Sequence, residues 1–243
     1  MKPFFDWIAP DDLSGEQLDA LLTMGWYRMH QTLFTLSHLE YEVSRQVHWL
    51  RMPVGAVTGS RAHRRIRKLN AGFHVRIDRL VSIPSAHAEL YARYRASIDF
   101  DGADTIRWSM YGPEVGDRNI FQTHVISVHD GDRLVAGGYF DVGDRSAASI
   151  LHFYDPEYAR YSPGKFLMLI TVDFLKENGF EFYYPGYLVA GWPKMNYKLF
   201  LGKDITEYYD PGTMSWLPFD ERILEADIEP DASDGDGAAP DTA

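Results

Sequence analysis

The sequence predicts an α+β fold in which a mixed, mostly antiparallel β-sheet is flanked by helices. Three strand-like runs follow one another at residues 121–128, 133–140 and 147–154. The turn between the first two, His129-Asp130-Gly131-Asp132, indicates a hairpin, because Asp-Gly tolerates the positive φ of tight turns. A long amphipathic helix and a strand at 180–184 come next. Antiparallel strands followed by a helix and a returning strand indicate one sheet covered by helices.

The N-terminal half mixes shorter helical and extended segments. The elements expected there are a short helix capped by Ser14, a strand at 47–54, a helix at 60–70, a strand at 74–81, a helix from Ser85 as its cap to about Ser97, and a loop at 101–118. The long helix after them is expected to have Ser162 as its N-cap, Pro163 at its first position and Gly179 beyond its end.

This order of elements resembles the N-acetyltransferase-like (GNAT) fold. In that fold, backbone N–H groups at the start of such a helix hold the pyrophosphate of an acyl carrier. The corresponding segment here is Arg160-Tyr161-Ser162-Pro163-Gly164-Lys165. It lacks the second glycine of the usual glycine-rich turn, so as a coenzyme A motif it is weak.

The composition excludes several classes of site. The 243 residues include no cysteine, which excludes disulfides, thiolate nucleophiles and iron–sulfur clusters. The histidines lack metal-ligand spacing, and we expect no metal or other cofactor. No apolar run is long enough to span a bilayer, and the N-terminus lacks the apolar stretch of a signal peptide. A cytoplasmic protein is therefore expected.

Charge divides the chain into three parts. The formal net charge of −11 argues against a nucleic-acid partner, but the acids are concentrated at one end. Residues 225–243 contain seven acidic and no basic residues among Ala, Gly, Pro and Ser, which predicts a disordered acidic tail. We expect an N-terminal region at 1–80 that contains a basic helix, and a GNAT-like catalytic domain at 81–224.

The basic helix is the helix expected at 60–70. Arg61, Arg64, Arg65 and Lys68 recur at i, i+3, i+4 and i+7, so they share one helix face. Ile66 and Leu69 point elsewhere and are expected to anchor the helix. A solvated charged face is the ordinary interpretation of such a run. Because these cations repel one another and no acid lies in the segment, a phosphate-backbone site is the alternative.

Two groups of motifs resemble the arginyl-tRNA–protein transferase family, including its bacterial leucyl-transferring branch. The first comprises Gly25-Trp26-Tyr27-Arg28, Leu50-Arg51-Met52-Pro53-Val54 and the basic helix. The second comprises Tyr154-Asp155-Pro156-Glu157-Tyr158, Tyr184-Pro185-Gly186-Tyr187 and Lys194-Met195-x-Tyr197-Lys198. Their order and spacing are similar to the family's over most of residues 20–218.

The resemblance implies a GNAT-type enzyme that transfers an amino acid, Arg or Leu, from aminoacyl-tRNA to the N-terminal amine of a protein, marking it as an N-degron. The implied partners are aminoacyl-tRNA and an acceptor protein or peptide with a free and acidic N-terminus. The family's N-terminal cysteines, which hold an iron–sulfur cluster in some members, are absent.

The roles that follow are assigned from the resemblance. The catalytic residues would be Tyr187, Lys194, Tyr197 and Lys198; the tRNA-binding residues Arg61, Arg64, Arg65 and Lys68; and the substrate-binding residues Arg28, Arg51, Tyr184 and Gly186. The tyrosines would stack on the terminal adenine or donate hydrogen bonds to the ester.

Two other functions stay open at this point. An acyl-coenzyme A-dependent N-acyltransferase of GNAT fold would bind coenzyme A with micromolar affinity. A non-catalytic relative would bind tRNA or acidic N-termini and turn over neither.

Overall fold

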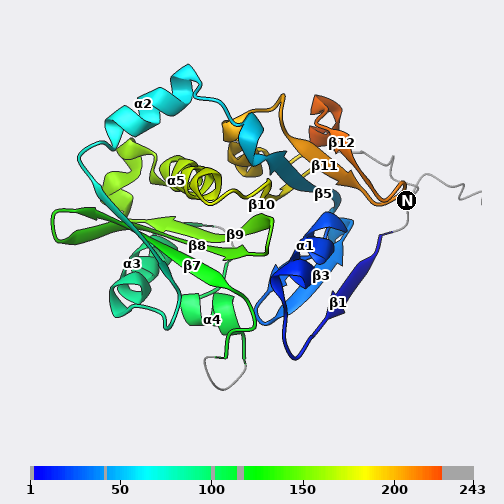
Figure 1. Ribbon diagram of the computed structural model, residues 1–243, viewed down its shortest axis with the longest axis horizontal. Coiled ribbons are helices and arrows are strands. Elements are labelled where there is room, and N and C mark those ends of the chain that lie inside the picture. Colours follow the sequence, from blue (N-terminus) through cyan, green and yellow to red (C-terminus); the bar gives the residue numbers. More distant parts are fainter. Residues whose placement is uncertain (1–2, 41–42, 100–101, 114–117, 226–243) are drawn as a thin grey trace, which may run out of the picture.

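The computed structural model describes residues 3–40, 43–99, 102–113 and 118–225. The predicted acidic tail lies outside these residues, apart from Glu225. The fold is α+β with a mixed, mostly antiparallel sheet flanked by helices, as the sequence predicted (Figure 1). No helix within the described ranges has the length and apolar character needed to cross a membrane.

Two sheets organise the described residues. The smaller has three strands in the order β1-β3-β2, and the larger has nine, in the order β12-β11-β5-β10-β9-β8-β7-β6 with β4 paired to β5. The strands are β1 (Phe5–Ile8), β2 (Tyr27–Met29), β3 (Thr32–Leu36), β4 (His38–Glu40), β5 (Ser44–Pro53), β6 (His74–Arg79), β7 (Thr123–Asp130), β8 (Arg133–Val142), β9 (Ser146–Tyr154), β10 (Phe182–Val189), β11 (Glu207–Asp210) and β12 (Ser215–Pro218).

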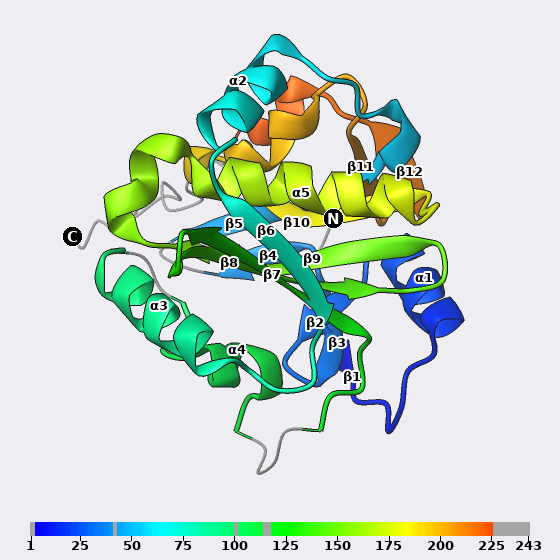
Figure 2. The ribbon, with the colours of Figure 1, turned by 60° about the vertical axis from the view of Figure 1, so that its left-hand side comes forward.

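Helices cover both faces of the larger sheet (Figure 2). Helix α5 (Pro163–Glu177) packs on β8 and β9 and carries α2 (Arg61–Leu69) on its outer side. On the opposite face lie α3 (Ser85–Ala96) and α4 (Ile106–Tyr111). Helix α1 (Gly15–Thr23) packs at the smaller sheet. Short 3₁₀ helices η1 (Val54–Ala56), η2 (Pro156–Tyr161), η3 (Pro193–Leu201) and η4 (Glu221–Leu224) complete the fold.

The connection from β9 to β10 sets up the only parallel pair among the strand pairs described. The chain leaves β9, passes through η2 and α5, and returns as β10 beside β9. The parallel pairing covers three residue pairs, from Phe182↔Ser146 to Tyr184↔Ala148. Helix α5 buries its apolar residues against this part of the sheet, so the start of the helix is held close to the end of the paired strands.

Most expected elements form, and the local reasons match the sequence. Ser14 and Gln17 make a reciprocal capping box at α1. The Ser60 hydroxyl accepts a hydrogen bond from the backbone N–H of His63 at the start of α2. Gly131 has a φ of 57° in the β7–β8 turn, which confirms the predicted hairpin.

Several local expectations were wrong. Ile66 is buried and anchors α2 as expected, but Leu69 is exposed, and buried His63 and Asn70 hold the helix in its place. Ser162 occupies the N-cap position of α5 and Pro163 follows it, as expected, but the Ser162 side chain makes no capping hydrogen bond and its backbone is left-handed, with φ 53°. Pro84, not Ser85, is the residue before α3.

The loop expected at 101–118 contains helix α4. Thr105 caps this helix by accepting a hydrogen bond from the backbone N–H of Trp108. Ile106, Met110 and Tyr111 are buried against α3 and the sheet, so tertiary packing outweighs the turn-forming composition of the segment.

The larger sheet runs across the boundary predicted at residue 80. Strands β5 and β6 come from residues 1–80, yet β5 pairs with β10 and β11, and β6 pairs with β7. The division into a region at 1–80 and a domain at 81–224 stays a prediction, and its boundary does not coincide with a break in the sheet.

Candidate functional site

A cavity of about 640 Å³ lies where β9 and β10 stop pairing. Beyond Tyr184, the strands diverge, and Ser149–His152 of β9 face Pro185–Tyr187 of β10 across the cavity. The first residues of α5 and parts of β2, β3, β5, α3, η2 and η3 close the remaining walls. The lining includes these residues predicted from the sequence: Arg28, Gly186, Tyr187, Lys194, Tyr197 and Lys198.

Bulges on both strands shape this opening. On β9, Ile150 is an extra residue between Ser149 and Leu151, which pair with consecutive residues of β8. On β10, the register against β5 shifts between Tyr183 and Gly186. A bulge interrupts the ladder and bends the strand, and here the two bulges lie at the point where the strands separate.

Gly186 allows a close approach to Lys198. Its φ of 105° is a conformation that residues with a Cβ rarely adopt. A Cβ at this position would also lie 3.2 Å from Cε of Lys198. Glycine therefore permits both the bend of β10 and the position of the lysine beneath it.

Lys198 is a buried cation in the cavity wall. The residue is only 9% exposed, and its Nζ donates to the carbonyl oxygen of Tyr187 at 2.9 Å and to Sδ of Met195 at 3.2 Å. Burial lowers the pKa of Lys198 from 10.5 to about 8, because a charged ammonium loses hydration in the interior. The amine therefore titrates close to neutral pH.

Aromatic rings surround this amine. The Nζ of Lys198 lies 5.2 Å from the ring centroid of Tyr187 and 5.4 Å from that of Tyr197, within the range of cation–π attraction. Tyr187 in turn contacts the buried Trp49, with centroids 5.0 Å apart. Tyr197 is 44% exposed and marks the open side of the cavity.

Every side chain of the described cavity lining that carries a charge at neutral pH is basic. They are Arg28, Lys165, Lys194 and Lys198, and no Asp or Glu is present among the described lining residues. Lys165 lies in the first turn of α5, with Nζ 5.2 Å from the ring centroid of Phe200. The Nζ of exposed Lys194 lies 4.8 Å from the Trp192 ring. The cavity is thus suited to anionic groups.

His152 contributes a neutral ring to the same wall. Burial, followed by the nearby charge of Lys198, lowers the pKa of His152 from 6.5 to about 4. Its Nε2 lies 3.2 Å from the hydroxyl of Ser149. At neutral pH the imidazole is uncharged, so it offers one donor and one acceptor rather than a further positive charge.

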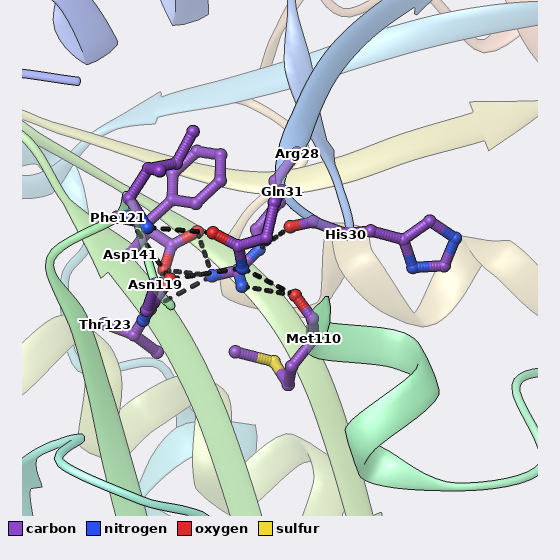
Figure 3. A network of polar contacts seen from close by, with 9 residues as sticks. Arg28, His30, Gln31, Met110, Asn119, Phe121, Thr123 and Asp141 are labelled. Carbon is purple, nitrogen blue, oxygen red and sulfur yellow. Dashed lines mark hydrogen bonds and ion pairs between the residues drawn. The ribbon is translucent and has the colours of Figure 1, made fainter. Parts of the chain in front are cut away.

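Arg28 lines the cavity but has its guanidinium bound within the protein (Figure 3). Its Nη1 donates to Asp141 at 2.9 Å and to the Thr123 hydroxyl at 3.0 Å. Nε and Nη2 donate to the carbonyl oxygens of His30 and Met110, at 2.6 and 2.8 Å. The side chains of the ion pair are 2% and 1% exposed. This network joins β2 to α4, β7 and β8, so Arg28 holds the cavity wall together.

The other two predicted substrate-binding side chains lie outside the described lining. Arg51 donates from Nε to Glu207 at 2.6 Å and is packed between the rings of Phe182 and Trp216. Tyr184 is 1% exposed and contacts the Tyr27 ring edge-on. Both side chains pack against the sheet and so are placed to stabilise it.

The basic helix α2 carries its four predicted cations on an exposed surface. We call Arg61, Arg64, Arg65 and Lys68 the basic stripe; in the described part of the chain none of them forms an ion pair with an acid. The stripe does not line the cavity. Two contacts nevertheless fix the helix near the cavity. Asn70 donates to the carbonyl oxygen of Tyr161, just before α5, and the His63 ring contacts the carbonyl oxygen of Phe200 in η3.

Sequence reasoning missed several residues of the cavity wall. Tyr27 and Trp49 stack with centroids 4.2 Å apart, and the Tyr27 hydroxyl donates to the carbonyl of Leu50 at 2.8 Å. Lys165 and His152 complete the polar lining. Tyr27 directly precedes Arg28 and Lys165 follows Gly164, so both stood inside quoted motifs. His152 carried no signal except its place in a strand.

Comparison with known proteins supports the resemblance. Residues 86–203 match the family described as "Arginine-tRNA-protein transferase, C terminus". An aspartate/glutamate leucyltransferase from Stutzerimonas stutzeri is 34% identical over 155 residues, which cover 61% of this chain and 63% of the relative. Arginyl-tRNA–protein transferase 1 from Drosophila melanogaster is 31% identical over 118 residues, covering 46% of this chain and 23% of the relative.

An aspartate/glutamate leucyltransferase from Paracoccus denitrificans is 29% identical. Its alignment is longer than that of the Stutzerimonas relative and covers 90% of this chain and 80% of the Paracoccus protein. The chain spans less than two thirds of the length of the Stutzerimonas and Drosophila relatives. Among solved structures, L-PGS from Bacillus licheniformis aligns with a TM-score of 0.43 and 10% identity, covering 71% of this chain and 50% of that one. That similarity is too distant to assign a fold family. Over residues 86–203, the chain is thus similar to the arginine-tRNA-protein transferase family.

Proposed function

We propose that the protein transfers an amino acid from aminoacyl-tRNA to the N-terminal amine of an acceptor protein. The observation that supports this most is that Tyr187, Lys194, Tyr197 and Lys198, which carried the sequence resemblance, line one cavity. The chain is also similar to the arginine-tRNA-protein transferase family over residues 86–203. We also infer a GNAT-like acyltransferase domain. The β9–α5–β10 crossover, with its single parallel pair, supports that inference.

The reaction needs positioning more than covalent catalysis. The neutral amine attacks the carbonyl carbon of the aminoacyl ester, the new C–N bond forms, and the bond to the 3′ oxygen of the terminal adenosine breaks. The proton lost by the amine goes to that leaving oxygen. Holding the two reactants together contributes most when they are aligned in one water-poor site.

The cations of the cavity assist in two ways. They lower the pKa of an incoming α-ammonium group, so that a larger fraction of it is the neutral nucleophile. Lys198 also carries the positive charge needed to stabilise a developing oxyanion, and its buried position strengthens that interaction. Tyr187 and Tyr197 offer rings on which a terminal adenine can stack.

The basic stripe is proposed as the contact for tRNA phosphates. Its four exposed cations belong to a helix fixed to the start of α5, where Lys165 enters the cavity. A tRNA bound along α2 could therefore extend its 3′ end past Lys165. Each phosphate contact of this kind adds salt-dependent affinity without sequence preference.

The chemistry of the lining favours leucine over arginine as the transferred amino acid. An arginine side chain in a closed site requires a carboxylate partner, and the described lining contains none. Ile150, Leu151 and Met195 instead offer apolar surface. Relatives named aspartate/glutamate leucyltransferase agree with this choice.

Their name and the basic lining also favour an acceptor with an N-terminal Asp or Glu. We place the reaction in the cytoplasm.

A pooled assay tests the proposal. The protein is incubated with a full set of charged tRNAs and peptides bearing N-terminal Asp, Glu or Ala, and products are identified by mass spectrometry. We expect leucine on the acidic peptides and no product after ribonuclease treatment. Absence of product with every aminoacyl-tRNA contradicts the proposal, and modification with acyl-coenzyme A would indicate the ordinary acyltransferase instead.

A further inference from the structure

A row of aromatic side chains leads from the surface into the cavity. In the smaller sheet, Phe34 of β3 is the register partner of Trp7 on β1 and of Tyr27 on β2. Directly opposed residues of antiparallel strands point to the same face. Trp7 is 56% exposed and Tyr27 4% exposed, and both Phe34 and Tyr27 line the cavity. The row is thus exposed at one end and buried at the other.

Phe5 widens the exposed end of this row. It lies two residues before Trp7 on β1, so the two side chains share a face. Its ring centroid is 6.5 Å from that of Phe34, and the residue is 58% exposed. We call Phe5, Trp7 and Phe34 the aromatic strip. Contiguous exposed apolar surface of this kind is typical of a binding site.

Charge decides which substrate fits the strip. Residues 3–19 contain five acids, Asp6, Asp11, Asp12, Glu16 and Asp19, and no Lys or Arg. An RNA backbone would be repelled there, whereas it would be attracted by the basic stripe. Helix α2 and strand β1 lie on opposite sides of the molecule (Figures 1 and 2). Two substrates can therefore reach the cavity without competing for one surface.

We propose that the aromatic strip binds the acceptor polypeptide. Its N-terminal residue occupies the cavity, and the apolar side chains that follow pack on Phe5, Trp7 and Phe34 in an extended conformation. This inference rests on the proposed function, and it adds a preference for apolar residues after the acidic N-terminal residue of the acceptor.

Acceptors of different length test the proposal. Trp7→Ala is compared with the unaltered protein using two acceptors, a dipeptide amide beginning with Asp and a decapeptide with Asp followed by apolar residues. We expect the KM for the decapeptide to rise about tenfold with kcat unchanged, and the KM for the dipeptide to stay the same. Trp108→Ala is the matched control, because Trp108 is 47% exposed on α4, outside the strip.

Three results overturn the proposal. They are an unchanged decapeptide KM, an equal rise for both acceptors, and weaker binding of charged tRNA in place of the peptide effect. If the unaltered protein transfers nothing, the proposed function fails. Calorimetry then tests separately whether the aromatic strip binds the decapeptide. Weaker binding in Trp7→Ala but not in Trp108→Ala supports it, and equal binding in all three proteins overturns it. Circular dichroism confirms that the variants are folded.

Discussion

Replacing Lys198 with methionine should stabilise the protein while removing its activity. Burial lowers the pKa of Lys198 from 10.5 to about 8, which corresponds to about 3 kcal/mol of destabilisation at pH 7. Methionine keeps the volume and removes the charge. Its main cost is the Tyr187 carbonyl left without its donor, about 1 kcal/mol. We therefore expect Lys198→Met to raise the free energy of unfolding by about 2 kcal/mol.

The free energy of unfolding should change with pH in a direction that the pKa shift of Lys198 determines. The pKa of Lys198 is lower in the folded than in the unfolded protein, so the unfolded chain binds the proton more tightly. The destabilisation is complete below pH 8 and is relieved as the pH rises from about 8 toward 10.5. Because methionine does not titrate, the advantage of the variant over the unaltered protein should disappear near pH 10.

The assays are urea unfolding at pH 7 and pH 10 and transfer of leucine from charged tRNA. The loss of transfer should be at least about a hundredfold, as for the removal of one group that stabilises an oxyanion. A variant that is less stable at pH 7 than the unaltered protein would refute the reasoning on burial. Retained transfer would refute the role of Lys198 in the site.

Three further predictions concern the rest of the molecule. Arg64→Ala with Arg65→Ala should weaken tRNA binding and flatten its log–log salt dependence by at most about two units; an unchanged slope relocates the tRNA site. Asp141→Asn should cost about 3–5 kcal/mol in urea unfolding by leaving buried Arg28 unpaired, and a cost below 1 kcal/mol contradicts it. Burial lowers the pKa of His87 from 6.5 to about 4. Because the unfolded chain then binds the proton more tightly, His87 should lower the free energy of unfolding by about 2 kcal/mol between pH 7 and pH 5. The variant His87→Gln should lack this contribution.

Local sequence signals predicted the elements around the cavity well. The hairpin turn at Gly131, the cap at Ser60 and the periodicity of α5 each depend on nearby residues, and each is present in the structure. The Lys-Met-x-Tyr-Lys motif also led to the cavity, since Lys194, Tyr197 and Lys198 all line it.

Long-range contacts could not be predicted in the same way. Arg28 and Arg51 were candidates for substrate recognition, but Asp141 and Glu207 pair with them from 113 and 156 residues away. No local sequence pattern predicts ion-pair partners that are so distant in the chain. Helix α4 was missed for a related reason, because its buried residues pack against segments distant in sequence.

The most direct test of the account is to locate a charged tRNA end on the protein. A hydrolysis-resistant leucyl-tRNA, with the amino acid joined to the 3′ position by an amide and carrying a photoreactive group, is cross-linked and the protein is digested for mass spectrometry. The account predicts cross-links within residues 149–165 and 185–198, which wall the cavity, and fewer in Lys198→Met. Cross-links confined to β11, β12 or α4, none of which lines the cavity in the described part of the chain, would contradict it.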